Sequence, residues 1–145
     1  MNKNIWVVLG GLAIGATWIT VARAGMKSTI PVVINSAARS AKGLIGSARN
    51  SADATQYIGC SMEAADGANP VIKCFASSSG GTVVTCSRTT VNPPIGLSVN
   101  AVELGFLSVA SSISNDSYLQ FNWDSTGKCT RIFVENSSDD EVKKF

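Results

Sequence analysis

Residues 116–136 read DSYLQFNWDSTGKCTRIFVEN, in which two runs of alternating side chains flank a four-residue polar break, Asp-Ser-Thr-Gly. The aspartate of such a break can bond the backbone that follows it, and the glycine can adopt the positive φ of a bulged hairpin. The stretch therefore predicts a β-hairpin with strands over residues 118–123 and 129–135.

The two faces of this hairpin differ in character. Alternation places Phe121 and Trp123 on one face of the first strand, where we expect them in the core. On the second strand, one side is predicted to carry Cys129, Arg131, Phe133 and Glu135, and the other Thr130, Ile132 and Val134. A carbohydrate- or peptide-binding sheet would use the mixed face and Trp123. The candidate contact surface on that face comprises Tyr118, Gln120 and Arg131.

An even number of cysteines in a small chain indicates a disulfide framework, here of Cys60, Cys74, Cys86 and Cys129. We favour disulfides over zinc because the chain has no Cys-x-x-Cys pair. Turns centred near Gly67 and Gly80 would set Cys74 on a middle strand, level with both Cys60 and Cys86. Either neighbour could bridge to Cys74. We favour Cys60–Cys74 with Cys86–Cys129.

Three further segments, residues 55–64, 70–76 and 82–87, are short, rich in β-branched or aromatic residues, and bounded by turn residues. Residues 99–113 show helical spacing of apolar residues, with Asn100 as a plausible N-cap. The fold class is therefore predicted as mainly β (α+β). It would be a disulfide-braced antiparallel sheet of about five strands, with an N-terminal amphipathic helix and one short internal helix.

The N-terminal helix is predicted over residues 28–50, where apolar residues recur every three or four positions. It would be either a terminal helix packed on its own core or a docking helix for a membrane surface or partner. The docking residues would be Arg39, Lys42, Leu44 and Ile45.

The first 24 residues are typical of a signal peptide, with Lys3, an apolar run and Ala22-Arg23-Ala24 as the cleavage site. Export with cleavage after Ala24 is expected, to the periplasm or the extracellular space. The alternative is an N-terminal membrane anchor. The rest divides into a basic amphipathic segment (25–50), a disulfide-braced β domain (51–138) and a polar tail (139–145).

The chain of 145 residues contains no histidine, which excludes Ser-His and Cys-His nucleophile systems. Residues 25–50 carry four basic side chains and no acidic one, whereas the remainder of the mature chain is acidic overall. No concentrated basic face for nucleic acid is predicted. We expect no catalytic residue, no metal and no cofactor.

The segments TQYIGC, VIKCFA, TCS and DSYLQFNWDSTGKCTRIFVENSS resemble those of a group of small exported bacterial four-cysteine proteins. These share a Tyr-x-Gly-Cys strand, a Cys-x-Ala strand and a closing Trp-Asp…Gly-x-Cys-Thr hairpin. The resemblance covers about residues 55–138. It implies export and a disulfide-braced domain, and it transfers no activity or site.

Three functions are open to such a chain. The first is an exported, non-enzymatic binding or assembly protein of the cell envelope or extracellular space, in contact with an unknown protein or with itself. The second is a secreted inhibitor or competition factor that binds another protein. The third is a carboxylate-based hydrolase, but Asp116 and Asp124 flank one strand and lie too far apart along it to share a site. A membrane is a partner only if the leader is retained.

Overall fold

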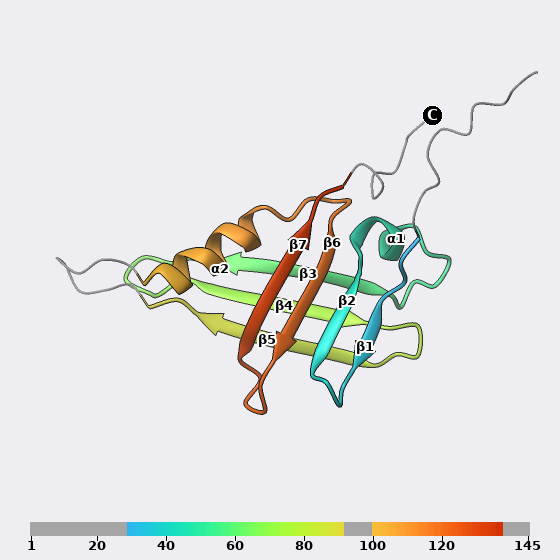
Figure 1. Ribbon diagram of the computed structural model, residues 1–145, viewed down its shortest axis with the longest axis horizontal. Helices are drawn as coiled ribbons and strands as arrows, with labels where there is room; N and C mark the ends of the chain where they lie inside the picture. The colour runs from blue at the N-terminus through green and yellow to red at the C-terminus, as the bar shows by residue number, and fades with distance from the viewer. Residues whose placement is uncertain (1–28, 92–99, 138–145) are drawn as a thin grey trace, which may run out of the picture.

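The computed structural model describes residues 29–91 and 100–137, which form two antiparallel sheets packed face to face (Figure 1). Sheet A has the strand order β1-β2-β6-β7, and sheet B, which lies behind it and crosses it, has the order β3-β4-β5. The elements are β1 (Val33–Asn35), β2 (Ser40–Leu44), α1 (Ile45–Arg49), β3 (Tyr57–Glu63), β4 (Val71–Ser77), β5 (Val83–Thr89), α2 (Ala101–Ser111), β6 (Tyr118–Trp123) and β7 (Cys129–Glu135).

The predicted antiparallel β class is confirmed, but the strands form two sheets rather than one. Neither helix in the described ranges is long and apolar enough to cross a membrane. The predicted leader (1–24) and tail (139–145) lie outside the described residues.

The core lies between the sheets. Sheet A contributes Leu119 and Phe121, which are fully buried, and sheet B contributes Ile72 and Ala76, also without exposure. Trp123 is partly buried against this cluster, with its ring 5.9 Å from that of Phe121. The predicted core positions of Phe121 and Trp123 are therefore confirmed.

Turn chemistry sets the register of sheet B. Gly67 adopts φ +73° in the β3–β4 turn, and Gly81, one residue after the predicted centre, adopts φ +73° in the β4–β5 turn. Cys74 consequently lies opposite Cys60 on one side and Cys86 on the other, as predicted.

The favoured disulfide pairing is confirmed. Cys60–Cys74 joins the neighbouring strands β3 and β4 within sheet B. Cys86–Cys129 joins β5 to β7 and is therefore a covalent link between the two sheets.

The predicted amphipathic helix is wrong for residues 33–44, which form the antiparallel strands β1 and β2 and the turn between them. Within residues 29–50, the described part of the predicted helix, only Ile45–Arg49 is helical. The apolar stripe there is mostly alanine, and Ala41 and Gly43 are buried in strand β2. A Cβ on Gly43 would lie 3.1 Å from the Cα of Val32, so this close backbone approach favours glycine. Strand β2 pairs with β6, and the basic segment thus belongs to the β domain.

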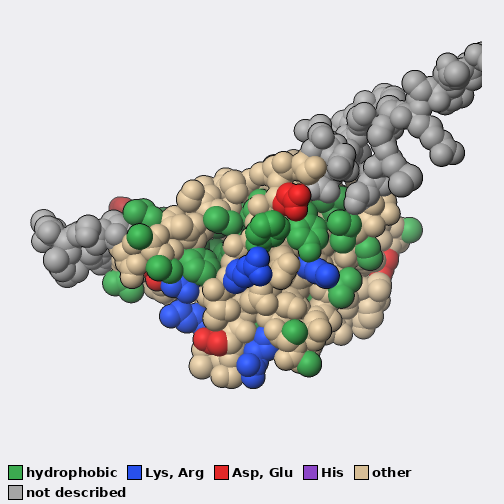
Figure 2. Space-filling view, viewed as in Figure 1, with side chains coloured by type: hydrophobic (Ala, Val, Ile, Leu, Met, Phe, Trp, Pro, Cys, Tyr) green, Lys and Arg blue, Asp and Glu red, His purple; other side chains and the backbone are tan. Residues whose placement is uncertain are grey.

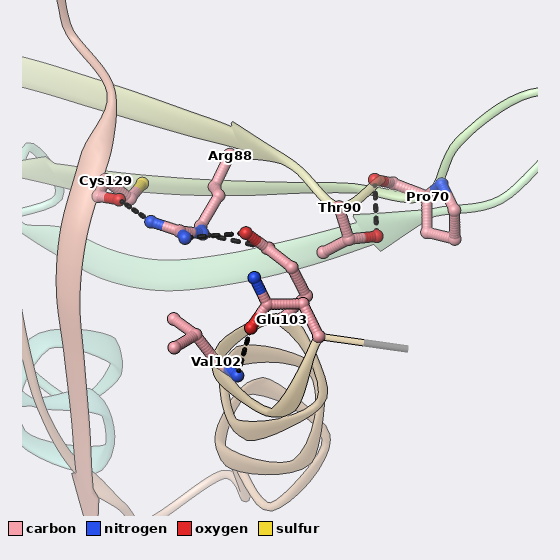
Figure 3. A network of polar contacts seen from close by, with 7 residues as sticks. Pro70, Arg88, Thr90, Val102, Glu103 and Cys129 are labelled. Atoms are coloured by element: carbon pink, nitrogen blue, oxygen red, sulfur yellow. Dashed lines mark hydrogen bonds and ion pairs between the residues drawn. The ribbon is translucent and has the colours of Figure 1, made fainter. Parts of the chain in front are cut away.

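Helix α2 confirms the predicted internal helix, and Asn100 caps it by accepting a hydrogen bond from the backbone of Val102. The helix is attached to both sheets through Arg88 on β5 (Figure 3). The guanidinium makes two hydrogen bonds to Glu103, of 2.7 and 3.1 Å, and one of 3.2 Å to the carbonyl oxygen of Cys129. It also lies 4.0 Å from the ring centroid of Phe106.

We expect Glu103→Gln to lower the free energy of unfolding by about 2 kcal/mol, because it leaves the Arg88 cation without its counter-charge. The Arg88 and Glu103 side chains are only 12% and 13% exposed, so water replaces the lost partner poorly. Urea unfolding measures the change. The matched control is Glu63→Gln, which breaks an exposed pair with Lys73 and is expected to be nearly neutral.

The same pair gives the protein an acid dependence. The hydrogen bond from Arg88 holds the pKa of Glu103 below its ordinary value of 4.5. The stability from this pair is therefore complete above that value and is lost as the pH falls below it. The free energy of unfolding of the Glu103→Gln variant should therefore fall less between neutral and acidic pH than that of the wild type. An equal fall in both proteins would contradict the stabilising role of the Arg88–Glu103 pair.

Candidate functional site

The outer face of sheet A is the surface that looks away from sheet B, and the strand register defines it. Val33, Lys42, Gln120 and Phe133 form one cross-strand row, and Asn35, Ser40, Asn122 and Arg131 form the next. Tyr118 lies opposite Glu135 in a third row at one end. Figure 2 shows basic side chains among hydrophobic ones over this sheet, with an acidic group near the upper edge.

The sequence-predicted contact residues Tyr118, Gln120 and Arg131 all lie on this outer face, on the adjacent strands β6 and β7. The predicted side for Cys129 is wrong, since Cys129 is fully buried while Arg131 faces outward. The register shifts after Asn122, because Asn122 pairs with Arg131 and Trp123 pairs with Cys129. Thr130 is therefore the extra residue of a β-bulge, which reverses the alternation of side chains along β7. The position of such a bulge cannot be recognised from the sequence of the strand alone.

The structure places the four predicted docking residues in different environments. Lys42 lies on β2 and faces outward beside Gln120, so it joins the outer face of sheet A. Arg39 is exposed in the β1–β2 turn with φ +47°. Leu44 is fully buried and is therefore not free to contact a partner, and Ile45 is partly buried against the core.

Sequence reasoning did not include Phe133 in the candidate site, although alternation had placed it on the same side as Arg131. Phe133 is 38% exposed, and its ring lies 6.3 Å from that of Tyr118, in an edge-on arrangement. The Arg131 guanidinium lies 5.6 Å from the Phe133 ring centroid. Two rings and a cation thus form one continuous surface on β6 and β7.

Two cations on this face have no ion-pair partner among the described residues, although Glu135 stands at one end of it. In the described ranges, Arg49, Lys73 and Arg88 each pair with an acidic side chain, at 3.2, 3.0 and 2.7 Å. Over the same residues, Arg39, Lys42, Lys128 and Arg131 have no acidic partner within 4.0 Å. Two of these four cations, Lys42 and Arg131, stand on the outer face of sheet A.

Hydrogen-bonding groups lie in the same and neighbouring rows as the cations. Burial, followed by the negative charge of Glu135, raises the pKa of Tyr118, so its hydroxyl stays protonated at neutral pH. The side-chain oxygen of Asn122 is buried and accepts no hydrogen bond from the described residues. Such an acceptor is the kind of group that a ligand hydroxyl can satisfy once neighbouring side chains shift.

Carboxylates elsewhere are held ionised. The hydroxyl and backbone of Thr55 lower the pKa of Asp53, and the hydroxyl of Thr126 with nearby backbone N–H groups lowers that of Asp124. Asp124 accepts bonds from the backbone of Thr126 and Lys128, which confirms the predicted turn role. A general acid needs the opposite shift.

The sulfur atoms of Cys74, Cys86 and Cys129 lie within 4.8 Å of one another. All four cysteines are in disulfides, which provide no thiolate ligand for a metal.

A shallow groove of about 260 Å³ separates α2 from β7 and adjoins the outer face of sheet A at Arg131. Its wall is mainly apolar, with Phe106, Val109 and Ile132.

Neither a protein-family model, nor a curated protein, nor a solved structure matches the chain.

Proposed function

We propose that the protein is an exported, non-enzymatic binding protein that holds an acidic polysaccharide on the outer face of sheet A. The observation that carries the proposal is the placement of two cations that have no acidic partner among the described residues, with Arg131 at the Phe133 ring beside Tyr118 and Lys42 in the same cross-strand row as Phe133. The two disulfides support export, because such bonds persist in oxidising compartments.

The chemistry of the face favours a sugar acid over a simple anion. A guanidinium or ammonium group binds carboxylates through charge-assisted hydrogen bonds. Exposed aromatic rings offer flat apolar surface on which the C–H face of a sugar ring can lie. The amide of Gln120, in the same row as Lys42 and Phe133, can bond hydroxyl groups in both directions.

We expect the purified protein to bind polygalacturonate, and to bind it more weakly as the ionic strength rises, because exposed charges are screened. Neutral dextran and polyglutamate are the comparison ligands. Dextran has sugar rings but no carboxylates, and polyglutamate has carboxylates but no sugar rings. Lys42→Gln combined with Arg131→Gln is expected to weaken polygalacturonate binding by roughly tenfold, on the order of 0.7 kcal/mol for each exposed contact. Isothermal titration calorimetry measures the affinities.

The matched control is Lys73→Gln, which removes a cation from the outer face of sheet B and should leave binding unchanged. Equal binding of polyglutamate would overturn the polysaccharide in favour of an acidic protein segment. Salt-sensitive oligomers that disappear in the Lys42→Gln/Arg131→Gln variant would identify a second copy of the chain as the occupant, which also overturns it.

A further inference from the structure

The two disulfides are neighbours in space. The sulfur of Cys74 lies within 4.8 Å of both sulfurs of the Cys86–Cys129 bond. Cys74 is bonded to Cys60 across β3 and β4, and in the strand register it lies directly opposite Cys86 on β5. One sulfur atom is therefore placed between its present partner and a second disulfide.

The four cysteines differ in exposure. Cys60 stands on β3, which is an edge strand of sheet B, and it is only partly buried. Cys74, Cys86 and Cys129 are all buried in the core. Thiol–disulfide exchange requires a thiolate to approach a disulfide sulfur directly, so an external thiol reaches Cys60 first. Cys74 is then the sulfur that leaves.

We propose that the four cysteines form a thiol–disulfide relay. Cleavage of the Cys60–Cys74 bond frees the sulfur of Cys74, which then cleaves the Cys86–Cys129 bond between the sheets. A dithiol reductant attacks the sulfur of Cys60, and Cys74 leaves as a thiolate. The second thiol of the reductant then displaces Cys60, which becomes a thiol, and the reductant becomes a cyclic disulfide. The reductant has lost two electrons, and the protein holds one disulfide fewer.

The Cys74 thiolate next attacks the sulfur of Cys86. A Cys74–Cys86 bond forms, the Cys86–Cys129 bond breaks, and Cys129 leaves as a thiolate that takes up a proton. This second step is an exchange without net oxidation or reduction. Opposite residues on antiparallel strands have Cα atoms close enough for a disulfide, so Cys86 is the expected target.

The relay changes what the remaining disulfide holds together. Cys86–Cys129 links sheet B to sheet A, whereas Cys74–Cys86 would link β4 to β5, which are already paired. Reduction at the partly exposed bond would thus release the covalent link between the sheets without a reductant entering the core. This inference is independent of the proposed polysaccharide.

The first test is limited reduction of the purified wild-type protein with dithiothreitol, followed by an acid quench, alkylation and peptide mapping. The expected two-electron-reduced species carries alkyl groups on Cys60 and Cys129 and retains a Cys74–Cys86 bond. Labels on Cys60 and Cys74 would show that the inner bond never moves and would overturn the relay. Labels on Cys86 and Cys129, on Cys60 and Cys86, or only on all four cysteines together would also overturn it.

The second test starts the relay without a reductant. In Cys60→Ser, Cys74 begins as a free thiol beside the inner disulfide, and after an acid quench and alkylation of the unfolded chain we expect the label on Cys129 while Cys74 is found bonded to Cys86. The matched control is Cys60→Ser/Cys74→Ser, which keeps Cys86–Cys129 and should show no labelling. Label that stays on Cys74 in the single variant would overturn the relay. If that variant does not fold, the limited reduction of the wild-type protein remains the deciding experiment.

Discussion

Replacing Phe121 with alanine is expected to lower the free energy of unfolding by about 4 kcal/mol. The ring is fully buried between the sheets, where it packs against Trp123. Its removal takes away both the transfer free energy of the ring and the contacts around the cavity that remains. Thermal and urea unfolding, followed by tryptophan fluorescence and circular dichroism, measure the loss.

Phe133→Ala is the control for this prediction. It removes the same side chain from the neighbouring strand, but from the outer face of sheet A, where the ring is 38% exposed. We expect a loss of about 1 kcal/mol or less, since a surface position makes few buried contacts. Equal losses for the two variants would contradict the assignment of inner and outer faces.

The second large effect is expected from the disulfide between the sheets. Replacing Cys86 and Cys129 together with alanine should cost about 4 kcal/mol, since this bond closes a loop with a sequence separation of 43. The cost follows from the chain-entropy argument, in which a longer closed loop restricts the unfolded chain more.

The matched comparison is the alanine pair at Cys60 and Cys74, whose sequence separation is 14 and whose expected cost is about 3 kcal/mol. Urea titration of both double variants gives the two losses, and the denaturant slope reports any change in the unfolded state. If the Cys60/Cys74 pair costs more, the link between the sheets is not the stronger brace.

Local signals in the sequence predicted most of the strands and their register. Gly67 and Gly127 both adopt the positive φ that a turn requires, and Asn100 caps α2. These features depend on a few neighbouring residues, so a single sequence contains enough information for them. The positions of Cys60, Cys74 and Cys86 relative to two turns then gave the correct register.

Features that depend on distant residues could not be predicted in the same way. Ala41 fits the predicted helical stripe and a strand equally well, and only the pairing with β6 and the approach of Val32 to Gly43 decide for the strand. The side-chain environment of Arg88 combines Glu103, Phe106 and Cys129, which are far apart in the sequence. Tertiary contacts of this kind override local propensity.

The candidate site was only partly predicted, because some of its residues depend on strand pairing between distant segments. Tyr118 and Gln120 follow from simple alternation along β6, whereas the inclusion of Lys42 required the β2–β6 pairing. The bulge at Thr130 then separated Arg131 from Cys129, which strict alternation had placed together.

The open edges of the two sheets are mostly protected. Helix α2 lies beside β7, and the β6–β7 turn closes on β5, where the backbone N–H of Ser87 donates to the carbonyl oxygen of Gly127. Helix α1 contacts β3. The remaining edge, β1, is only three residues long, which is too short to serve as a template for a continuous ladder. The described part of the domain therefore has little tendency to polymerise through its own backbone at high protein concentration.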